Sequence, residues 1–310
     1  MPKTVCRHLL WAVAVVAGVF AGSYKPQSAT SAAAASVQFA VIGDSGTGAT
    51  EQYDVAAAMA AMRSRRPFEF VLMLGDNVYG GWNQKAVTER FEKPYKPLLD
   101  AGVQFYASLG NHDDGNERSY APFHMHGERY YAFTRSNVDF FALDSNYMDR
   151  SQLLWLEQQL QASRAPWKIA FFHHPLYSSG ARHGSEKDLR RVLEPLLIRY
   201  GVQLVFSGHD HVYERVKPQH GITYFVCGSS GELRRGNLDK GSDLTAAGFD
   251  QDRAFMLIDV AGDTLQFQAI SRTNAIVDSG QITLATRVSR SPTAVEGTTT
   301  NREHRVRPAA

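Results

Sequence analysis

Residues 204–211 read Leu-Val-Phe-Ser-Gly-His-Asp-His, an apolar run followed at once by two histidines two positions apart. Imidazoles placed in this way are typical of metal binding rather than of packing. Four earlier apolar runs end similarly, in Gly43-Asp44-Ser45-Gly46, Gly75-Asp76-Asn77-Val78-Tyr79, Gly110-Asn111-His112-Asp113 and His173-His174-Pro175. Because ligands bind at the carboxyl ends of strands in open α/β sheets, we expect these five clusters to converge in space.

The rest of the chain alternates strand-like and helix-like segments. Short β-rich apolar runs predict strands at 37–42, 69–74, 103–108, 138–143, 167–172, 202–206, 222–227, 254–259 and 264–270. The alanine-rich segment 50–65 predicts one helix. The apolar residues of 151–163, with Ser151 as N-cap, and of 185–200 predict two more. No linker or repeat interrupts 37–286, so we predict one α/β (α+β) layered domain with antiparallel additions.

Composition and charge exclude several classes of protein. A content of 44% apolar and 21% charged residues excludes disordered, collagen-like and coiled-coil chains. Residues 1–21 contain two basic residues and no acidic one, and residues 287–310 contain five arginines and two glutamates. The central segment 22–286 therefore has 26 basic and 29 acidic residues. Nucleic-acid binding normally needs a basic face, so this mildly acidic central segment is a poor candidate for it and we expect no nucleic-acid partner.

The first 21 residues have the pattern of an export signal. Lys3 and Arg7 precede the thirteen-residue apolar run 9–21, which is too short to span a bilayer but matches a signal-peptide core. Cleavage could follow Ala21 or fall as late as residue 36, and a retained membrane anchor is the alternative. We therefore expect a secreted or periplasmic protein without a stable membrane anchor. The polar tail 287–310 is expected to be disordered.

The number of cysteines limits disulfide formation, and the types of possible ligand atoms indicate which metals could bind. Cys6 lies in the predicted signal, so processing would leave only Cys227 and no intrachain disulfide. Carboxylate, imidazole and amide oxygen suit Fe, Mn or Zn rather than a thiolate site. Each cluster alone has a simpler interpretation, since a Gly-Asp pair is typical of a turn and His173-His174-Pro175 could merely end a strand. The five together favour a shared metal centre.

The order of these motifs resembles the calcineurin-like metallophosphoesterase superfamily, and Tyr79, three residues after Asp76, is similar to the purple acid phosphatases. The length and the 208–211 motif resemble the small, tartrate-resistant form, whereas Tyr213-Glu214-Arg215 is closer to the larger plant-type enzymes. The resemblance implies a four-layer αββα sandwich of two mixed β-sheets flanked by helices. The metals would then lie at the edge formed by the strand carboxyl ends.

The resemblance also implies two metal sites. Carried over by motif, the first metal would be bound by Asp44, Asp76, Tyr79 and His211, and the second by Asp76, Asn111, His173 and His209. A tyrosine phenolate is a hard anionic donor, so the first ion is expected to be Fe(III). The second site, with two imidazoles and an amide oxygen, suits divalent Fe, Zn or Mn.

The implied activity is hydrolysis of phosphate monoesters by attack of a metal-bound hydroxide on phosphorus. His112 and His183 would act on the substrate, although the position of His183 needs a one-residue insertion after His174. We expect His174 to point away from its ligand neighbour, and Asp113 either to support His112 or to finish a turn. The substrate would be a small-molecule phosphate ester and the protein a monomer.

Two other functions remain open. A phosphodiesterase or nucleotide hydrolase of the same superfamily would use the same metals, and a non-catalytic phosphate-binding protein could keep the fold. The small enzymes have a long regulatory loop between a strand that ends in Leu-Asp and the next helix. This chain lacks room for such a loop, since Asp144 is only a few residues from the helix predicted at 151. We therefore expect a site open to bulky esters such as nucleotides. The disulfide of that family is absent as well.

Overall fold

Two mixed β-sheets form the framework of the protein. The computed structural model describes residues 36–239 and 241–284. One sheet has the strand order β13-β12-β11-β1-β2-β3, and the other has the order β10-β8-β9-β7-β6-β5-β4. Strands β1, β2 and β3 run parallel, as do β5, β6, β7 and β9, whereas the other neighbours are antiparallel.

The elements have the following bounds. The strands are β1 (Ser36–Ile42), β2 (Phe70–Met73), β3 (Gln104–Ala107), β4 (Tyr131–Arg135), β5 (Val138–Ala142), β6 (Trp167–Phe171), β7 (Leu204–Ser207), β8 (Tyr213–Val216), β9 (Thr223–Cys227), β10 (Thr245–Phe249), β11 (Ala254–Ala261), β12 (Thr264–Ser271) and β13 (Ile276–Thr283). The α-helices are α1 (Thr50–Arg63), α2 (Gln84–Val87), α3 (Lys96–Asp100), α4 (Arg150–Ala162) and α5 (Lys187–Arg199). A short π-helix is η1 (Thr88–Glu92), and two short 3-10 helices are η2 (Gly115–Ser119) and η3 (Ala121–Phe123).

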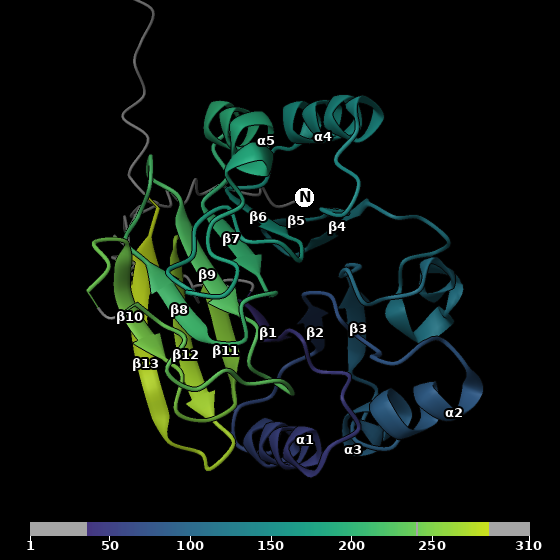
Figure 1. Cartoon of the computed structure of the whole chain (residues 1–310). Coiled ribbons are helices and arrows are strands. Elements are labelled where there is room, and N and C mark those ends of the chain that lie inside the picture. The colour runs from purple at the N-terminus through teal and green to yellow at the C-terminus, as the bar shows by residue number, and fades with distance from the viewer. Residues whose placement is uncertain (1–35, 240, 285–310) are drawn as a thin grey trace, which may run out of the picture. The chain divides into compact units, whose positions relative to one another are not determined.

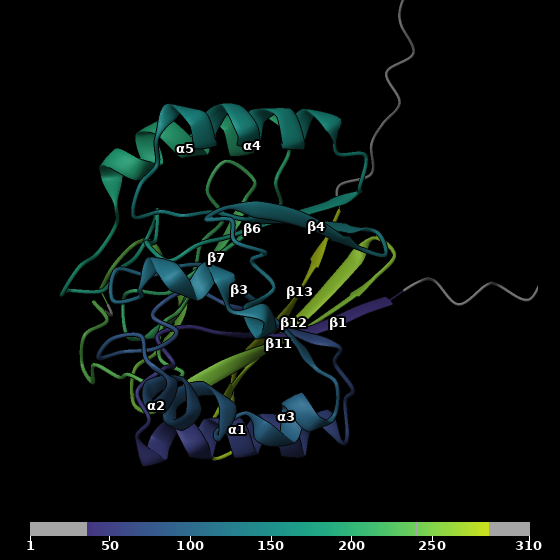
Figure 2. The same cartoon turned by 90° about the vertical axis from the view of Figure 1, so that its right-hand side faces the viewer.

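Helices cover the outer faces of both sheets. Helices α1 and α3 lie along the first sheet, and α4 and α5 lie along the second (Figures 1 and 2). Leu156 of α4 and Leu193 of α5 belong to one buried cluster with Val205 of β7. The four layers confirm the expected αββα sandwich of two mixed sheets.

Aromatic side chains fill the space between the two sheets. The ring of Phe39 on β1 stacks on Phe70 of β2, with a centroid distance of 5.2 Å, and meets Phe140 of the opposite sheet edge-on at 5.3 Å. Phe206 of β7 approaches the same ring at 6.3 Å. These side chains are buried. Burial of large aromatic rings is a major source of stability, so this layer locks the two sheets together.

The register of the parallel strands aligns their carboxyl ends. Ile42 of β1 pairs with Met73 of β2, and Met73 pairs with Ala107 of β3. In the other sheet Phe171 of β6 pairs with both Ala142 and Phe206. The loops that follow these strands therefore begin at one level, as the sequence motifs predict.

Some elements differ from the sequence-based expectation. The helix expected from 151 begins at Arg150, because the Asp149 carboxylate, not Ser151, accepts the N-cap hydrogen bond from the Gln152 N–H at 2.8 Å. Strands β4, β8, β10 and β13 were not predicted. Their residues are polar or partly exposed and so lack a continuous apolar run.

Several expectations concern the ends of the chain. The predicted signal at 1–21 and the predicted tail at 287–310 lie outside the described residues. In the part that is described, no helix combines the length and apolar character needed to cross a membrane. The Cys227 thiol is free and buried. Its burial raises its pKa to about 12, so it stays protonated at neutral pH.

Candidate metal centre

The loops after β1, β2, β3, β6 and β7 meet at one edge of the sandwich. They carry Asp44, Asp76, Asn111, His173 and His209, respectively. Carboxylate oxygens of Asp44 and Asp76 and a ring nitrogen of His173 all lie within 4.8 Å of one another. Residues far apart in the sequence are thus brought together. The Asp44 carboxylate, for example, accepts a hydrogen bond from the backbone N–H of His209, 165 positions later.

Three of these residues adopt a strained backbone conformation. Asp44, Asp76 and His209 have positive φ angles of 51°, 52° and 68°. This left-handed region is uncommon for residues other than glycine and persists where surrounding contacts determine it. The N–H of Asp44 donates to the Gly75 carbonyl at 3.0 Å, and the N–H of His209 donates to Asp44 Oδ2 at 2.9 Å. Such strain is typical of a functional site.

Two glycines allow the loops to approach the carboxylates closely. A Cβ atom on Gly110 would lie 2.2 Å from Asp76 Oδ1, and a Cβ on Gly208 would lie 2.4 Å from Asp44 Oδ2. Both contacts are shorter than any that real Cβ atoms make. Only glycine fits at these two positions, which explains the glycine that precedes Asn111 and the glycine that precedes His209.

His173 presents an unprotonated nitrogen to the site. Its Nδ1 lies 2.9 Å from the Leu74 carbonyl oxygen, which can only accept a hydrogen bond, so Nδ1 carries the proton. Burial, together with nearby His174, holds the pKa of His173 well below its ordinary value, so the ring is neutral. The lone pair of Nε2 therefore points into the cluster. A backbone acceptor on the far nitrogen is the usual arrangement for a metal-binding histidine.

Around that lone pair, acceptor atoms converge without enough protons to pair them. His173 Nε2 lies 3.0 Å from Asn111 Oδ1, 3.1 Å from His209 Nδ1 and 3.5 Å from Asp76 Oδ1. Burial and the neighbouring histidines lower the pKa of His209 to about 2, so it brings at most one proton to these contacts. A cation would compensate this concentration of electron pairs, so the donor set fits a bound metal ion.

A second group of donors surrounds Asp44. Its Oδ1 lies 3.5 Å from the Tyr79 hydroxyl and 3.4 Å from His211 Nε2. Burial raises the pKa of Asp44, and burial together with the charges of Asp44 and Asp76 raises that of Tyr79 far above its ordinary value. Burial alone would lower the pKa of His211, but its hydrogen bond to Asp44 raises it. These groups therefore hold protons that a bound cation would displace.

His112 and His183 lie beside the cluster and are exposed. The backbone N–H of His112 donates to Asp76 Oδ1 at 2.9 Å, and its ring centroid is 5.0 Å from that of Tyr79. The His183 ring lies 4.2 Å from the His209 ring. Both histidines are therefore positioned to reach a substrate, and the one-residue insertion before His183 does not carry it away from the site.

The expectation that His174 points away from the site is wrong. Ring nitrogens of His173, His174 and His209 all lie within 4.8 Å of one another. The chain bends at 173–174, so the side chains do not alternate as they would in a strand. His174 Nδ1 lies 2.8 Å from Ser145 Oγ, which orients the ring. The sequence carries no local signal of this bend other than Pro175.

Asp113 and Asp210 support the loops. Of the two roles expected for Asp113, the structure shows the turn, since its N–H donates to the Gly110 carbonyl at 3.3 Å, whereas the sequence analysis assigned no role to Asp210. Asp113 accepts hydrogen bonds from the backbone N–H groups of Asn77 (2.6 Å) and Gly110 (2.8 Å), and so joins two of the loops instead of contacting the His112 ring. The buried Asp210 carboxylate accepts from Ser178 Oγ at 2.5 Å and from the Gly184 N–H at 3.0 Å. It thereby fixes the segment that carries His183.

A loop after β9 also reaches the site and was missed by the sequence analysis. The N–H of Glu232 donates to the Asp44 carbonyl, and the N–H of Arg234 donates to the His211 carbonyl, both at 3.0 Å. A Cβ on Gly231 would lie 2.4 Å from the Ser45 carbonyl oxygen. The Gly-Ser-Ser-Gly run at 228–231 was the only sequence signal of this approach.

The family follows from this region of the chain. A family model described as calcineurin-like phosphoesterase matches residues 37–213, more than half of the chain and all five loops. The chain belongs to the calcineurin-like phosphoesterase family. This confirms the superfamily indicated by the order of the motifs.

Two curated relatives of the chain are named as acid phosphatases. The tartrate-resistant acid phosphatase type 5 of Rattus norvegicus is 28% identical over 241 residues, covering 64% of this chain and 73% of the rat protein. Purple acid phosphatase 17 of Arabidopsis thaliana is 27% identical, and the match covers 66% of this chain and 71% of the Arabidopsis protein. These relatives confirm the resemblance to purple acid phosphatases and the expectation of a hydrolase.

Solved structures share the fold. The purple acid phosphatase PPD1 from yellow lupin (Lupinus luteus) superimposes with a TM-score of 0.69 at 17% identity, over 81% of this chain and 54% of that one. GAP50, described as the anchor in the inner membrane complex of Plasmodium, gives a TM-score of 0.71 at 21% identity, over 81% and 90%. The fold of a calcineurin-like phosphoesterase thus occurs in a protein described as an anchor, and chemistry must be argued from the site.

Removing the metals should make stability depend on pH. Burial raises the pKa of Asp113 to about 8 and that of Glu117 to about 10, so the folded state retains protons that the unfolded chain releases above pH 4. Between pH 7 and 9 unfolded histidines are already neutral. These carboxyl groups then contribute to the slope together with the buried Cys227 thiol, which also keeps a proton that the unfolded chain begins to release. We expect the metal-free protein to become less stable from pH 7 to 9, with its Tm falling by about 5 °C or more.

Thermal unfolding in the presence of a chelator measures this slope. The matched variant Glu117→Gln keeps an acceptor for the Asp114 N–H and should flatten the slope. Metal-loaded protein should also show a flatter slope, since cations favour the ionised carboxylates. A metal-free protein that gains stability over this range would contradict the assignment.

Proposed function

We propose that the protein is a binuclear-metal acid phosphatase that hydrolyses phosphate monoesters. The observation that carries the proposal is the convergence of Asn111, His209 and Asp76 on the unprotonated Nε2 of His173. Asp76 belongs to this group, and its charge also acts on Tyr79 in the second group. A carboxylate has two oxygens, so Asp76 is suited to bridge two ions.

The residues present suggest how two ions would be held. One ion would be bound by Asp44, Asp76, Tyr79 and His211, and the other by Asp76, Asn111, His173 and His209. Because burial and two carboxylates oppose ionisation of Tyr79, its phenolate requires a strongly charged cation. That requirement favours Fe(III) at the first site, whereas the imidazoles and amide of the second suit divalent Fe, Zn or Mn.

The remaining residues would orient the substrate and manage its protons. When bound, the ions would supply Lewis acidity that neutralises phosphate charge and lowers the pKa of the attacking water. His112 is held by its backbone bond to Asp76, so its exposed ring can donate a proton to the leaving oxygen. His183, on the segment anchored by Asp210, can donate a hydrogen bond to a phosphoryl oxygen.

Two features support a monoester as substrate. A monoester offers three terminal phosphoryl oxygens and a diester only two, so the two ions and two exposed histidines are better used by a monoester. Relatives named as acid phosphatases support the same choice. Export from the cytoplasm is part of the proposal and is supported by the basic start and the apolar run of residues 1–21.

Hydrolysis of matched model esters tests this function. Purified protein loaded with iron and a divalent ion should hydrolyse p-nitrophenyl phosphate faster than bis-p-nitrophenyl phosphate, by at least about tenfold in kcat/KM, because the diester offers fewer oxygens to the site. A preference for the diester would favour a phosphodiesterase on the same metals. Binding of phosphate without turnover of either ester would favour a non-catalytic phosphate-binding protein.

Two histidine variants separate proton transfer from metal binding. His112→Ala should keep both metals, because its side chain is outside the proposed ligand set, yet reduce turnover by about 10²–10⁴-fold. His209→Ala should lower the content of the divalent ion. Metal analysis and steady-state kinetics on both variants measure the difference, and equal metal loss in the two would show that the roles are misassigned.

A tyrosine variant tests the identity of the first ion. Oxidised protein should absorb broadly in the visible range if the Tyr79 phenolate binds Fe(III), and Tyr79→Phe should lose that band while it retains both ions. Tyr120→Phe, which alters a tyrosine bonded to Glu92, is the control and should keep the band. A colourless, iron-free enzyme with full activity would overturn the Fe(III) assignment and leave the phosphatase proposal intact.

A further inference from the structure

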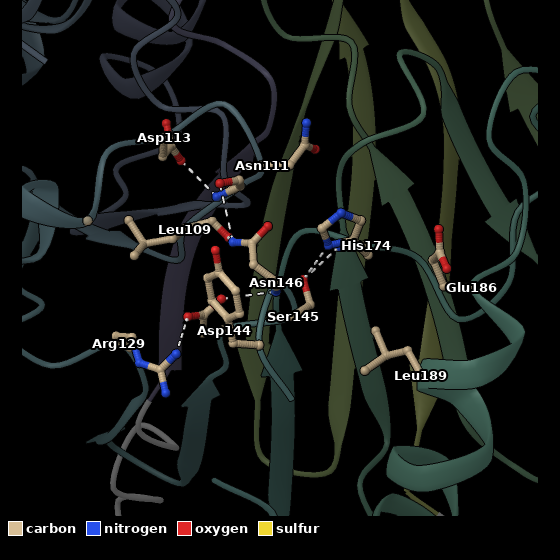
Figure 3. A pocket seen from close by; sticks show the side chains of 13 residues that line it. Leu109, Asn111, Asp113, Arg129, Asp144, Ser145, Asn146, His174, Glu186 and Leu189 are labelled. Atoms are coloured by element: carbon tan, nitrogen blue, oxygen red, sulfur yellow. Dashed lines mark hydrogen bonds and ion pairs between the residues drawn. The ribbon is translucent and has the colours of Figure 1, made fainter. Parts of the chain in front are cut away.

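A cavity of about 590 Å³ opens beside the proposed second metal site. Asn111 and His174 belong to its wall next to the site, Asn146 and Tyr147 come from the connection between β5 and α4, and Glu186 and Leu189 come from the start of α5 and the residue before it (Figure 3). Its volume lies in the range of small-molecule pockets, which is about 300–1,000 Å³. A group joined to a phosphate at the metal centre could therefore extend into it.

The wall formed by the β5–α4 connection is held rigidly. The Asn146 side-chain amide donates to the carbonyls of Leu109 and Gly110, each at 3.2 Å, and its backbone N–H donates to Asp144 Oδ1 at 3.0 Å. Arg129 pairs with Asp144 Oδ2 at 3.3 Å. Because these contacts tie the connection to the neighbouring loops, little ordering is needed on binding.

Tyr147 gives this wall an exposed aromatic surface. Its side chain is 68% exposed, although it lines the cavity and belongs to a rigid connection. The guanidinium carbon of Arg129 lies 5.8 Å from its ring centroid. Leu109 and Leu189 add apolar surface to the cavity. A ring available in this way can stack on a planar group, whereas a short alkyl group would use little of it.

The charges of the cavity disfavour an anionic occupant. Asp113 and Asp144 are already engaged by hydrogen bonds or by Arg129. The Glu186 carboxylate, by contrast, has no hydrogen-bond or ion-pair partner among the residues that the structure describes. An unpaired carboxylate repels a second anion and accepts hydrogen bonds from an amine.

We propose that this cavity binds the leaving group of the ester and selects planar, uncharged or cationic groups, with Tyr147 as the stacking surface and Glu186 as the residue that rejects anions. The inference rests on the proposed phosphatase function and adds the substrate class to it. Aryl alcohols and nucleosides share this chemistry, and the substrates below distinguish them.

Substrate pairs that differ only in the part reaching the cavity test the role of Tyr147. The first pair is adenosine 5′-monophosphate and ribose 5-phosphate, which share a leaving oxygen and differ by the base. The second pair is phenyl phosphate and methyl phosphate, which differ by the aromatic ring. Tyr147→Ala should lower the kcat/KM ratio of at least one pair by about 5- to 30-fold. A fall in the first pair identifies a nucleoside site, and a fall in the second alone identifies an aryl site. The control Ile276→Ala, 57% exposed on β13, should change neither ratio.

Charge selection and binding are measured separately. Glu186→Gln should raise the kcat/KM ratio of 4-carboxyphenyl phosphate to phenyl phosphate by about three- to tenfold. Calorimetry with the non-hydrolysable benzylphosphonate and methylphosphonate gives a readout without turnover, and Tyr147→Ala should reduce the preference for the benzyl compound.

The outcomes separate this inference from the proposal on which it rests. Unchanged ratios in Tyr147→Ala and Glu186→Gln, with methyl phosphate still hydrolysed, would overturn the leaving-group site and leave the phosphatase function standing. Failure of the metal-loaded wild-type protein to hydrolyse any of these esters would overturn the phosphatase function itself, and the leaving-group site with it.

Discussion

One hydrogen bond between the two sheets sets the geometry of the candidate metal centre. His173, which follows β6 in the second sheet, donates from Nδ1 to the carbonyl of Leu74, which follows β2 in the first sheet, at 2.9 Å. The bond joins the loops that follow these strands at the carboxyl-terminal edges of the two sheets. Because a carbonyl can only accept, it also leaves the Nε2 lone pair free for the site. Asp76 and Asn111 from one sheet and His209 from the other meet at that nitrogen.

Two features let the loops around that bond lie close to one another. Glycines leave room for the carboxylates of the site, and two further aspartates, outside the proposed ligand set, hold the loops in place. Gly110 and Gly208 leave room for the Asp76 and Asp44 oxygens, where a Cβ atom would overlap them. Asp113 and Asp210 accept backbone N–H groups and hold the loops in these positions. The site is therefore preorganised by its surroundings, a condition for tight metal binding and for catalysis.

The sandwich itself does not decide what happens at this edge. It is shared, with TM-scores of 0.69 and 0.71, by a purple acid phosphatase and by a protein described as an anchor. The chemistry at this edge depends on the donor atoms that the chain places there and on the wall beside them. The connection between Ala142 and Arg150 is short and is tied down by Asn146, so it borders a cavity instead of covering the site.

The sequence by itself determined the inner strands, the clusters at their carboxyl ends and the nearness of His183, because continuous apolar runs and strand-end ligand types are local patterns. Only the tertiary structure decided the edge strands, the direction of His174 and the roles of Asp113 and Asp210. Strand β8 shows why: its Arg215 is satisfied by Asp278, 63 residues away. Likewise the cavity is built from residues between 109 and 189 that no local pattern connects. Partners distant along the chain are chosen by packing, and a local pattern carries no record of that choice.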